Sequence, residues 1–443
     1  MPSTSTAALP AFDRESVSWW RVGLLAILSL YHNELLAALI GIGDEVMRQM
    51  GFPLLIAGAG LGLLFLLMTG ALFRHPFLLW PLVLVGVFIL TSLFANTVFY
   101  PKSLKDWLPA HYIYLPILQL YLMAALRYTD RDILWGLLFT GLVAAVLTLG
   151  YRFGAFQFLE YYSRRSIFGE TERRVVVMKY EFLYATLVLL SLGMASRLAV
   201  WAKGLGLLGL ALLLALQIGV VQSRQGLIAV GVGAAVLMAL DRRTFEPLTL
   251  LTRAALGLVA LVVVPIALAP YIDLLGRDDL VESDQLNVGI RLQAFQHYLG
   301  YFRETWGVGF GMSSPSARLN NVIAEALAHA YNFSDLGLWA AFLQFGIVGG
   351  SLATFLTLLT IRTGIQAART LPDQDAWRPA VLAAYFIGWM CVPVPINVFT
   401  LPKSIHFGAL ALYLVWYYRN ALRYQRSATA PTPAVPITSP LPA

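Results

Sequence analysis

Long uninterrupted apolar segments constrain this chain more than any other feature of its sequence. They recur along its 443 residues, in runs of roughly 18–25, the length of helix that crosses about 30 Å of hydrocarbon. Inside a bilayer the backbone must satisfy its own hydrogen bonds, so such segments form helices. Only 12% of the residues are charged, against about 25% in soluble domains. We therefore expect an all-α, polytopic membrane protein.

The apolar runs predict about twelve transmembrane helices, at 18–42, 52–73, 76–99, 108–126, 132–152, 180–200, 203–221, 225–240, 250–274, 336–361, 378–397 and 404–421. The first nine fall within 1–274, with a shorter basic loop near 153–180. A long loop at 275–335 precedes the last three helices, within 336–421. The tail at 422–443 has too little apolar content to fold, so we expect a disordered cytoplasmic end.

The distribution of Lys and Arg predicts the orientation in the membrane. If both termini are cytoplasmic, the short cytoplasmic segments carry many basic residues, such as Arg74, Arg197 and Arg362, and the short outer loops carry few. This is the usual bias of cytoplasmic loops. The formal charge of +7 does not indicate nucleic acid, because no basic soluble domain is present. It favours an anionic lipid surface or an anionic substrate.

Two outer segments break this charge pattern. The loop at 153–180 carries Arg173, Arg174 and Lys179, and the loop at 275–335 carries Arg291 and other arginines. Basic residues kept on the outer side are explained by a bound anion, such as a phosphate held by guanidinium groups. The alternative is a solvated loop whose basic residues pair with carboxylates such as Glu170.

Arg224 lies in the turn between the predicted helices at 203–221 and 225–240, within the segment Gln-Ser-Arg-Gln-Gly. An arginine at the start of a helix, beside free backbone N–H groups, suits a phosphate. The alternative is an interfacial arginine that extends to lipid head groups.

The long loop contains an amphipathic run that includes Arg291, followed by the segment Thr-Trp-Gly-Val-Gly-Phe-Gly at 305–311. Gly309 and Gly311 permit sharp bends and close approach of a ligand. No strand precedes these glycines, so a dinucleotide-binding fold is not indicated.

Polar residues precede the predicted helix at 336–361. His329 and Asp335 are both candidates for a general base that accepts a hydroxyl proton, and Asn332 lies between them. The alternatives are a surface histidine and a helix cap formed by Ser334 or Asp335. The helix itself then carries Gly346, Gly349 and Gly350.

The order of these elements resembles the O-antigen ligase and polymerase superfamily. The resemblance covers roughly residues 160–360 and rests on Ser223-Arg224, on Arg291 before the glycines of 305–311, and on a polar position before Gly-x-x-Gly. It implies a GT-C-like membrane fold and an inverting, metal-independent glycosyltransferase without a cofactor. The implied site is on the periplasmic face of a bacterial inner membrane.

The resemblance also implies residue roles. Arg224 and Arg291 match the arginines that hold the diphosphate of an undecaprenyl-diphosphate-linked glycan donor. Ligases carry a His-Asn pair about eleven residues before the first glycine of Gly-x-x-Gly, where this chain has Asp335-Leu336. The base is therefore either His329 or Asp335, and the aspartate is more similar to repeat-unit polymerases. Arg173, Arg174, Lys179, Gly309, Gly311 and Asn332 would bind substrate.

Three other functions compete with repeat-unit polymerisation. An O-antigen ligase would use lipid A-core as the acceptor instead of another glycan. A metal-dependent lipid-phosphate glycosyltransferase would use Asp44 and Glu45 in the first outer loop. A lipid-linked sugar transporter would depend on charges inside the membrane, but the sequence shows no convincing internal repeat. His32 and His406 lie in or near apolar helices and indicate no particular chemistry.

Overall fold

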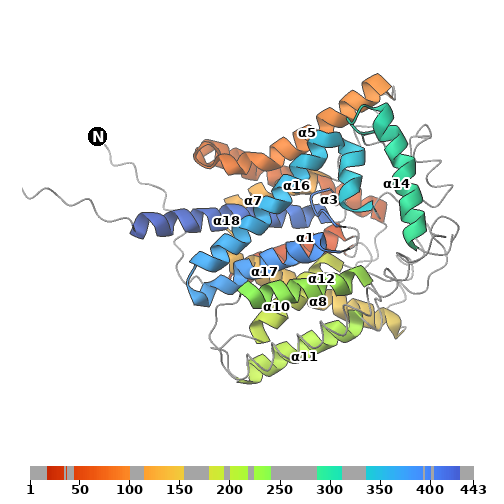
Figure 1. The fold of residues 1–443 in the computed structure, drawn as a ribbon. Coiled ribbons are helices and arrows are strands. Elements are labelled where there is room, and N and C mark those ends of the chain that lie inside the picture. Colours follow the sequence, from red (N-terminus) through yellow and green to blue (C-terminus); the bar gives the residue numbers. More distant parts are fainter. Residues whose placement is uncertain are drawn as a thin grey trace, which may run out of the picture.

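A computed structural model describes residues 17–33, 36, 44–99, 114–153, 179–193, 200–217, 224–240, 287–311, 336–392, 395–400 and 404–429. These residues form helices and connecting turns, and no strand occurs among them (Figure 1). The all-α prediction is therefore confirmed for the part of the chain that is described. The predicted segment at 250–274 lies outside it.

Every other predicted apolar segment overlaps at least one helix. The elements are α1 (Trp19–His32), α3 (Asp44–Met68), α4 (Ala71–Arg74), η1 (Pro76–Leu79), α5 (Trp80–Phe94), η2 (Ala95–Phe99), α7 (Gln119–Ala125), α8 (Asp130–Arg152), α10 (Lys179–Gly193), α11 (Val200–Leu216), α12 (Arg224–Leu240), α14 (Asn287–Glu304), α16 (Leu338–Thr370), α17 (Asp373–Met390) and α18 (Ile405–Thr429). Pro76 and Pro81 lie in the first turns of η1 and α5, where a helix tolerates a missing N–H.

Two helices extend beyond their predicted ends. α16 continues to Thr370 and α18 to Thr429, so the chain remains helical for several residues past the predicted start of the tail at 422. The predicted cap of α16 by Ser334 or Asp335 is wrong, because the residue at the cap position is Gly337 and no side chain caps the helix. Instead, the Leu338 N–H donates to the Pro395 carbonyl oxygen over 2.6 Å.

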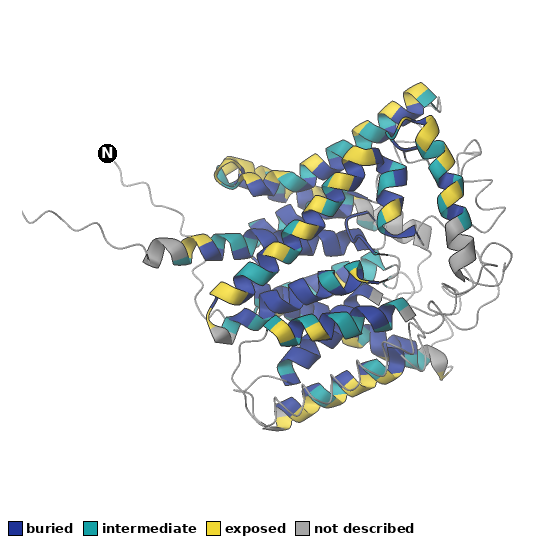
Figure 2. Ribbon diagram, viewed as in Figure 1, coloured by how far each residue is buried: buried dark blue, intermediate teal, exposed yellow. Residues whose placement is uncertain are grey.

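Length and composition support a membrane location. Among the described residues, three helices are long and apolar enough to cross a bilayer, over Pro76–Phe99, Asp130–Gly150 and Leu338–Thr370. Further apolar helices are shorter, such as Lys203–Leu216. On α11 an exposed row of Trp201, Leu205, Leu208 and Leu212 follows the helical repeat (Figure 2). A contiguous apolar surface of this kind suits lipid rather than water.

Most helices run roughly side by side, and α14 crosses one end of them (Figure 1). We call this the α14 end of the bundle. α1 and α5 finish there, and α10, α12, α16 and α18 begin there. The opposite end, here the far end, contains the start of α8, the start of α17 and the last turns of α16 and α18. Buried tyrosine and phenylalanine side chains fill the centre, among them Tyr184, Tyr385 and Phe407.

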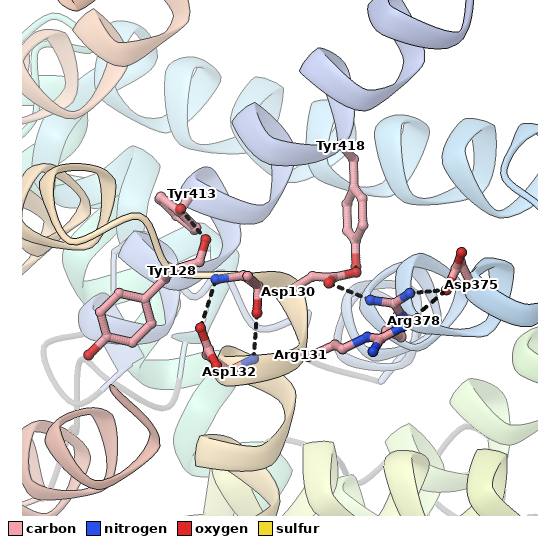
Figure 3. A network of polar contacts seen from close by, with 9 residues as sticks. Tyr128, Asp130, Arg131, Asp132, Asp375, Arg378, Tyr413 and Tyr418 are labelled. Atoms are coloured by element: carbon pink, nitrogen blue, oxygen red, sulfur yellow. Dashed lines mark hydrogen bonds and ion pairs between the residues drawn. The ribbon is translucent and has the colours of Figure 1, made fainter. Parts of the chain in front are cut away.

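Ion pairs and a hydrogen bond join four helices at the far end, and Figure 3 shows the part of this network around Asp130 and Arg378. The Arg378 guanidinium of α17 contacts Asp130 of α8 over 2.5 Å and also pairs with Asp375. The Tyr418 hydroxyl of α18 donates to the second carboxylate oxygen of Asp130 over 3.3 Å. Arg21 of α1 pairs with Asp132 over 3.2 Å.

The same region caps α8. The Thr129 hydroxyl accepts the Asp132 N–H over 3.2 Å, and the Asp132 carboxylate accepts the Thr129 N–H over 3.0 Å. This reciprocal pair is a capping box. Asp132 also accepts the Ser18 N–H over 2.8 Å, so one carboxylate caps α8 and binds the start of α1.

Candidate functional site

The candidate site is built around a break in α16 at the α14 end of the bundle. Gly346 has φ 70° and ψ −174° inside the helix, so the intrahelical hydrogen bonds are interrupted there. The segment 305–311 occupies the break. The N–H groups of Phe310 and Gly311 donate to the carbonyl oxygens of Leu343 and Gln344 over 3.2 and 2.9 Å, and the Ile347 N–H donates to the Gly307 carbonyl oxygen over 2.9 Å.

Glycine is required where the two backbones meet. A Cβ atom at Gly309 would lie 2.5 Å from the Gln344 carbonyl oxygen, and one at Gly346 would overlap the Val308 carbonyl group. A Cβ atom at Gly311 would lie 2.9 Å from the Cα of Ser92. All three glycines also have a positive φ, a conformation that is unfavourable for residues with a side chain. Close packing of this chain therefore explains Gly309 and Gly311, and a direct contact with substrate stays a prediction.

Aromatic side chains hold α14 on the same joint. The Tyr298 ring of α14 stacks on Phe310 with ring centres 5.5 Å apart, and Phe345 stacks on Phe88 of α5 at 3.8 Å. Burial raises the pKa of Tyr298 to about 12, so its hydroxyl is neutral at physiological pH. The Thr305 hydroxyl accepts the Gly309 N–H over 3.2 Å. α14 thus packs on the segment that follows it, this segment is bound to α16, and α16 in turn packs on α5.

Trp306 has an unusual conformation in this segment. Its φ is 51°, although it is not glycine, and 84% of its surface is exposed. Its ring meets the edge of Phe99, with centres 5.7 Å apart. A left-handed conformation costs a non-glycine residue roughly 1–2 kcal/mol, and strain of this kind is concentrated at functional sites. Nothing in the sequence pattern distinguishes Trp306 as a site residue. An exposed indole beside the joint is suited to contact a sugar or a lipid.

Three predicted basic residues lie on helices that meet at the α14 end. Arg224 is the first residue of α12, Lys179 is the first residue of α10, and Arg291 lies in the first turns of α14. α10 and α12 pack side by side and both begin at this end. The N-termini of two parallel helices therefore carry basic residues at the α14 end, a combination that favours an anion.

The remaining predicted site residues lie outside the described part of the chain. These are Arg173 and Arg174 of the shorter loop, and His329, Asn332 and Asp335 of the long loop. The identity of the general base and the contributions of these residues to substrate binding stay predictions.

A buried polar cluster at the α14 end was not predicted. Glu181 of α10 is fully buried, and one of its carboxylate oxygens accepts from the Asn33 side chain over 2.9 Å and contacts the His406 Nε2 atom over 2.7 Å. The His32 ring stacks on His406 with centres 5.1 Å apart and contacts the Gln119 amide. Four helices therefore supply polar side chains to one buried cluster.

Glu181 of this cluster lies in the first turn of α10, which begins at the predicted basic residue Lys179. The sequence indicates such a cluster only through isolated ionisable residues in apolar runs, because such residues in a membrane usually pair with one another. It does not show which residues pair, because His32, Glu181 and His406 are far apart along the chain. Among the described residues, no group of three or more His, Cys, Asp or Glu side chains is arranged to hold a metal ion.

Comparison of the chain with models of known protein families finds no match, and comparison with curated proteins finds no relative.

Proposed function

We propose that this protein is a glycosyltransferase of a bacterial inner membrane that transfers a glycan from an undecaprenyl-diphosphate carrier to an acceptor on the periplasmic face. The favoured reaction is polymerisation of repeat units of a surface polysaccharide, as in O-antigen or exopolysaccharide biosynthesis. The proposal includes about twelve transmembrane helices in a GT-C-like arrangement, cytoplasmic termini, and a site at the α14 end of the bundle.

One observation carries the proposal: α14, which contains Arg291, is fixed across the end of the bundle at which α12 begins with Arg224. The glycine segment that follows α14 does this by filling the break in α16. The helices that carry Arg224 and Arg291 and the glycine segment thus lie at one end of the bundle. Arginines in the first turns of helices at a membrane surface suit a lipid-linked diphosphate.

The proposed reaction is an inverting displacement. The oxygen of an acceptor hydroxyl forms a bond with the anomeric carbon of the donor, and the bond between that carbon and the diphosphate oxygen breaks. The base, either His329 or Asp335, takes the hydroxyl proton. Undecaprenyl diphosphate leaves with the bonding electrons, and Arg224 and Arg291 stabilise the negative charge that develops on it.

The acceptor decides between polymerase and ligase. A polymerase transfers the growing glycan to the next lipid-linked repeat unit, so its product is a ladder of lengths. A ligase transfers the glycan once to lipid A-core. The aspartate at position 335, where ligases carry a His-Asn pair, favours the polymerase.

The test is a transfer assay with purified protein and an undecaprenyl-diphosphate-linked oligosaccharide, in the presence of EDTA. We expect transfer by the wild type, and a loss of at least about a hundredfold in Arg224→Ala and Arg291→Ala, as for a lost transition-state hydrogen-bond donor. His329→Ala and Asp335→Ala are compared in the same assay, and the one that abolishes turnover identifies the base.

A matched control comes from α14 itself. Arg303 lies on the same helix with its side chain exposed, and Arg303→Ala should transfer at close to the wild-type rate. Loss of transfer in this control as large as in Arg291→Ala would mean that the charge of the helix matters and not one guanidinium. Transfer that needs a divalent cation and fails in Asp44→Asn or Glu45→Gln would overturn the proposal in favour of the metal-dependent mechanism.

A further inference from the structure

A cavity at the far end of the bundle, between α16 and α18, lies away from the candidate site. Its volume is about 230 Å³, and its lining includes Arg362, Thr363 and Gln366 of α16 and Arg419 and Arg423 of α18. A water molecule occupies roughly 30 Å³ in the liquid, so the cavity has room for a phosphate group. Three guanidinium groups and two further polar side chains surround it.

The charge of this cavity is one-sided. None of the described residues that line it is acidic. Burial lowers the pKa of the neighbouring His75, and the positive charges of Arg423 and Arg74 lower it further. An array of like charges around one cavity favours an anionic ligand.

A second cavity adjoins the first along α16. Its volume is about 570 Å³, and it shares Arg362 and Gln366 with the first cavity. The rest of its described lining consists of the apolar Leu358, Ile361 and Ile365 and of Arg369 and Thr370 at the end of the helix. Leu358 is also among the exposed apolar residues on the outer surface of the bundle. The ligand must therefore match a basic cavity that continues into an apolar groove on the lipid-facing side.

We propose that these cavities bind one anionic phospholipid, with its phosphate among Arg362, Arg419 and Arg423 and an acyl chain along Leu358, Ile361 and Ile365. Basic cavities between helices at the cytoplasmic surface are suited to anionic lipid head groups, and guanidinium forks pair with phosphate oxygens through two parallel hydrogen bonds. A soluble anion would fill the first cavity and leave the apolar groove exposed. This site is independent of the proposed transfer reaction.

The test is native mass spectrometry of delipidated protein, titrated with phosphatidylglycerol or with phosphatidylcholine that carries the same acyl chains. We expect the first phosphatidylglycerol to bind at least about tenfold more tightly than phosphatidylcholine, a difference of roughly 1.4 kcal/mol. Arg362→Gln and Arg419→Gln should each remove most of this preference. Arg419→Lys, which keeps the charge without the fork, should retain an intermediate preference.

Two comparisons assign the effect to this site. Arg127→Gln removes an exposed guanidinium at the same end of the bundle but outside the cavity, and should bind like the wild type. Dibutanoyl phosphatidylglycerol, whose chains are too short for the groove, should bind more weakly than the long-chain lipid. A thermal melting curve of each variant verifies that it is folded.

Three results would overturn the inference. The first is equal binding of phosphatidylglycerol and phosphatidylcholine by the wild type, which would leave the arginines as ordinary interfacial side chains. The second is an equal loss in Arg127→Gln and Arg419→Gln. The third is competition by millimolar inorganic phosphate together with no dependence on acyl-chain length, which would identify a soluble anion as the ligand.

Discussion

The two ends of the helix bundle are held together by different kinds of contact. At the far end, charged side chains from α1, α8 and α17 form ion pairs inside the protein, and Tyr418 of α18 donates a hydrogen bond to Asp130. At the α14 end, the backbone of 305–311 enters the break in α16, and glycines allow the two chains to touch. Ion pairs depend on which side chains are present, whereas the glycine joint depends on which side chains are absent.

The two kinds of contact determine different properties of the fold. The backbone hydrogen bonds between 305–311 and α16 fix the position of α14 without using its side chains. The faces of α14 that do not pack on the bundle therefore remain free of these contacts. Buried ion pairs instead set which helices meet, because an unpaired charge there is costly. The pairs at the far end accordingly determine which helices meet there, and the joint at the α14 end determines where α14 lies.

The largest effect on stability is expected at the far end. Arg378→Met leaves Asp130 and Asp375 without their main cation, and breaking a buried pair in this way costs roughly 3–5 kcal/mol. The melting temperature of the purified protein in detergent would measure the loss. Arg131→Met is the matched control: its pair with Asp375 spans 3.8 Å and is part-exposed, so its removal should cost less than about 1 kcal/mol. Equal losses in both variants would show that burial does not govern this network.

The second effect tests the glycine joint. Gly346→Ala forces a Cβ atom against the Val308 carbonyl and strains a positive φ, which together should cost roughly 2–4 kcal/mol. We expect α14 to detach, so that limited proteolysis cleaves between 287 and 311 while the rest of the bundle stays protected. Gly300→Ala on α14, where nothing lies within 4 Å of a new Cβ atom, should leave the cleavage pattern unchanged. Protection of α14 in Gly346→Ala would contradict the joint.

The third effect concerns the buried cluster at the α14 end. Glu181→Leu removes one of the two acceptors of the Asn33 amide, which still donates to the Ser29 carbonyl oxygen, and it removes the carboxylate that contacts the buried His406 ring. The loss of this partner by one buried polar group should cost roughly 1–3 kcal/mol. Thermal melting would report it, with Glu304→Leu at an exposed position as the control. A Glu181→Leu protein as stable as the wild type would show that the cluster does not hold the helices together.

The sequence predicted the helices well because apolar length is a local property. The segment 76–99 is predicted to the residue and is continuous through η1, α5 and η2. The break itself was not predictable, because it needs the partner segment 305–311 from elsewhere in the chain. The same reason hid the pairing of Glu181 with His406 and of Asp130 with Arg378. The sequence predicts Arg224 in the turn directly before a helix, whereas it is the first residue of α12, and it predicts Arg291 in an amphipathic run, which forms α14. The relation of the two residues to each other depends on how α14 crosses the bundle.

The smallest effect on stability, and the one that best separates folding from function, is expected at Trp306. Because its φ is 51°, Trp306→Gly relieves backbone strain, and loss of the exposed indole removes little packing beyond the edge contact with Phe99. Stability should change by less than about 1 kcal/mol in either direction.

Glycan transfer should nevertheless fall in Trp306→Gly, since an aromatic face beside the joint would no longer contact the sugar or the lipid of the donor. Trp306→Phe, which keeps an aromatic ring, should retain more transfer than Trp306→Gly at equal stability. A Trp306→Gly protein that transfers glycan at the wild-type rate would mean that the strained conformation serves only the turn before Gly307. In that case Arg224 and Arg291 would bind the donor without a contact from this aromatic side chain.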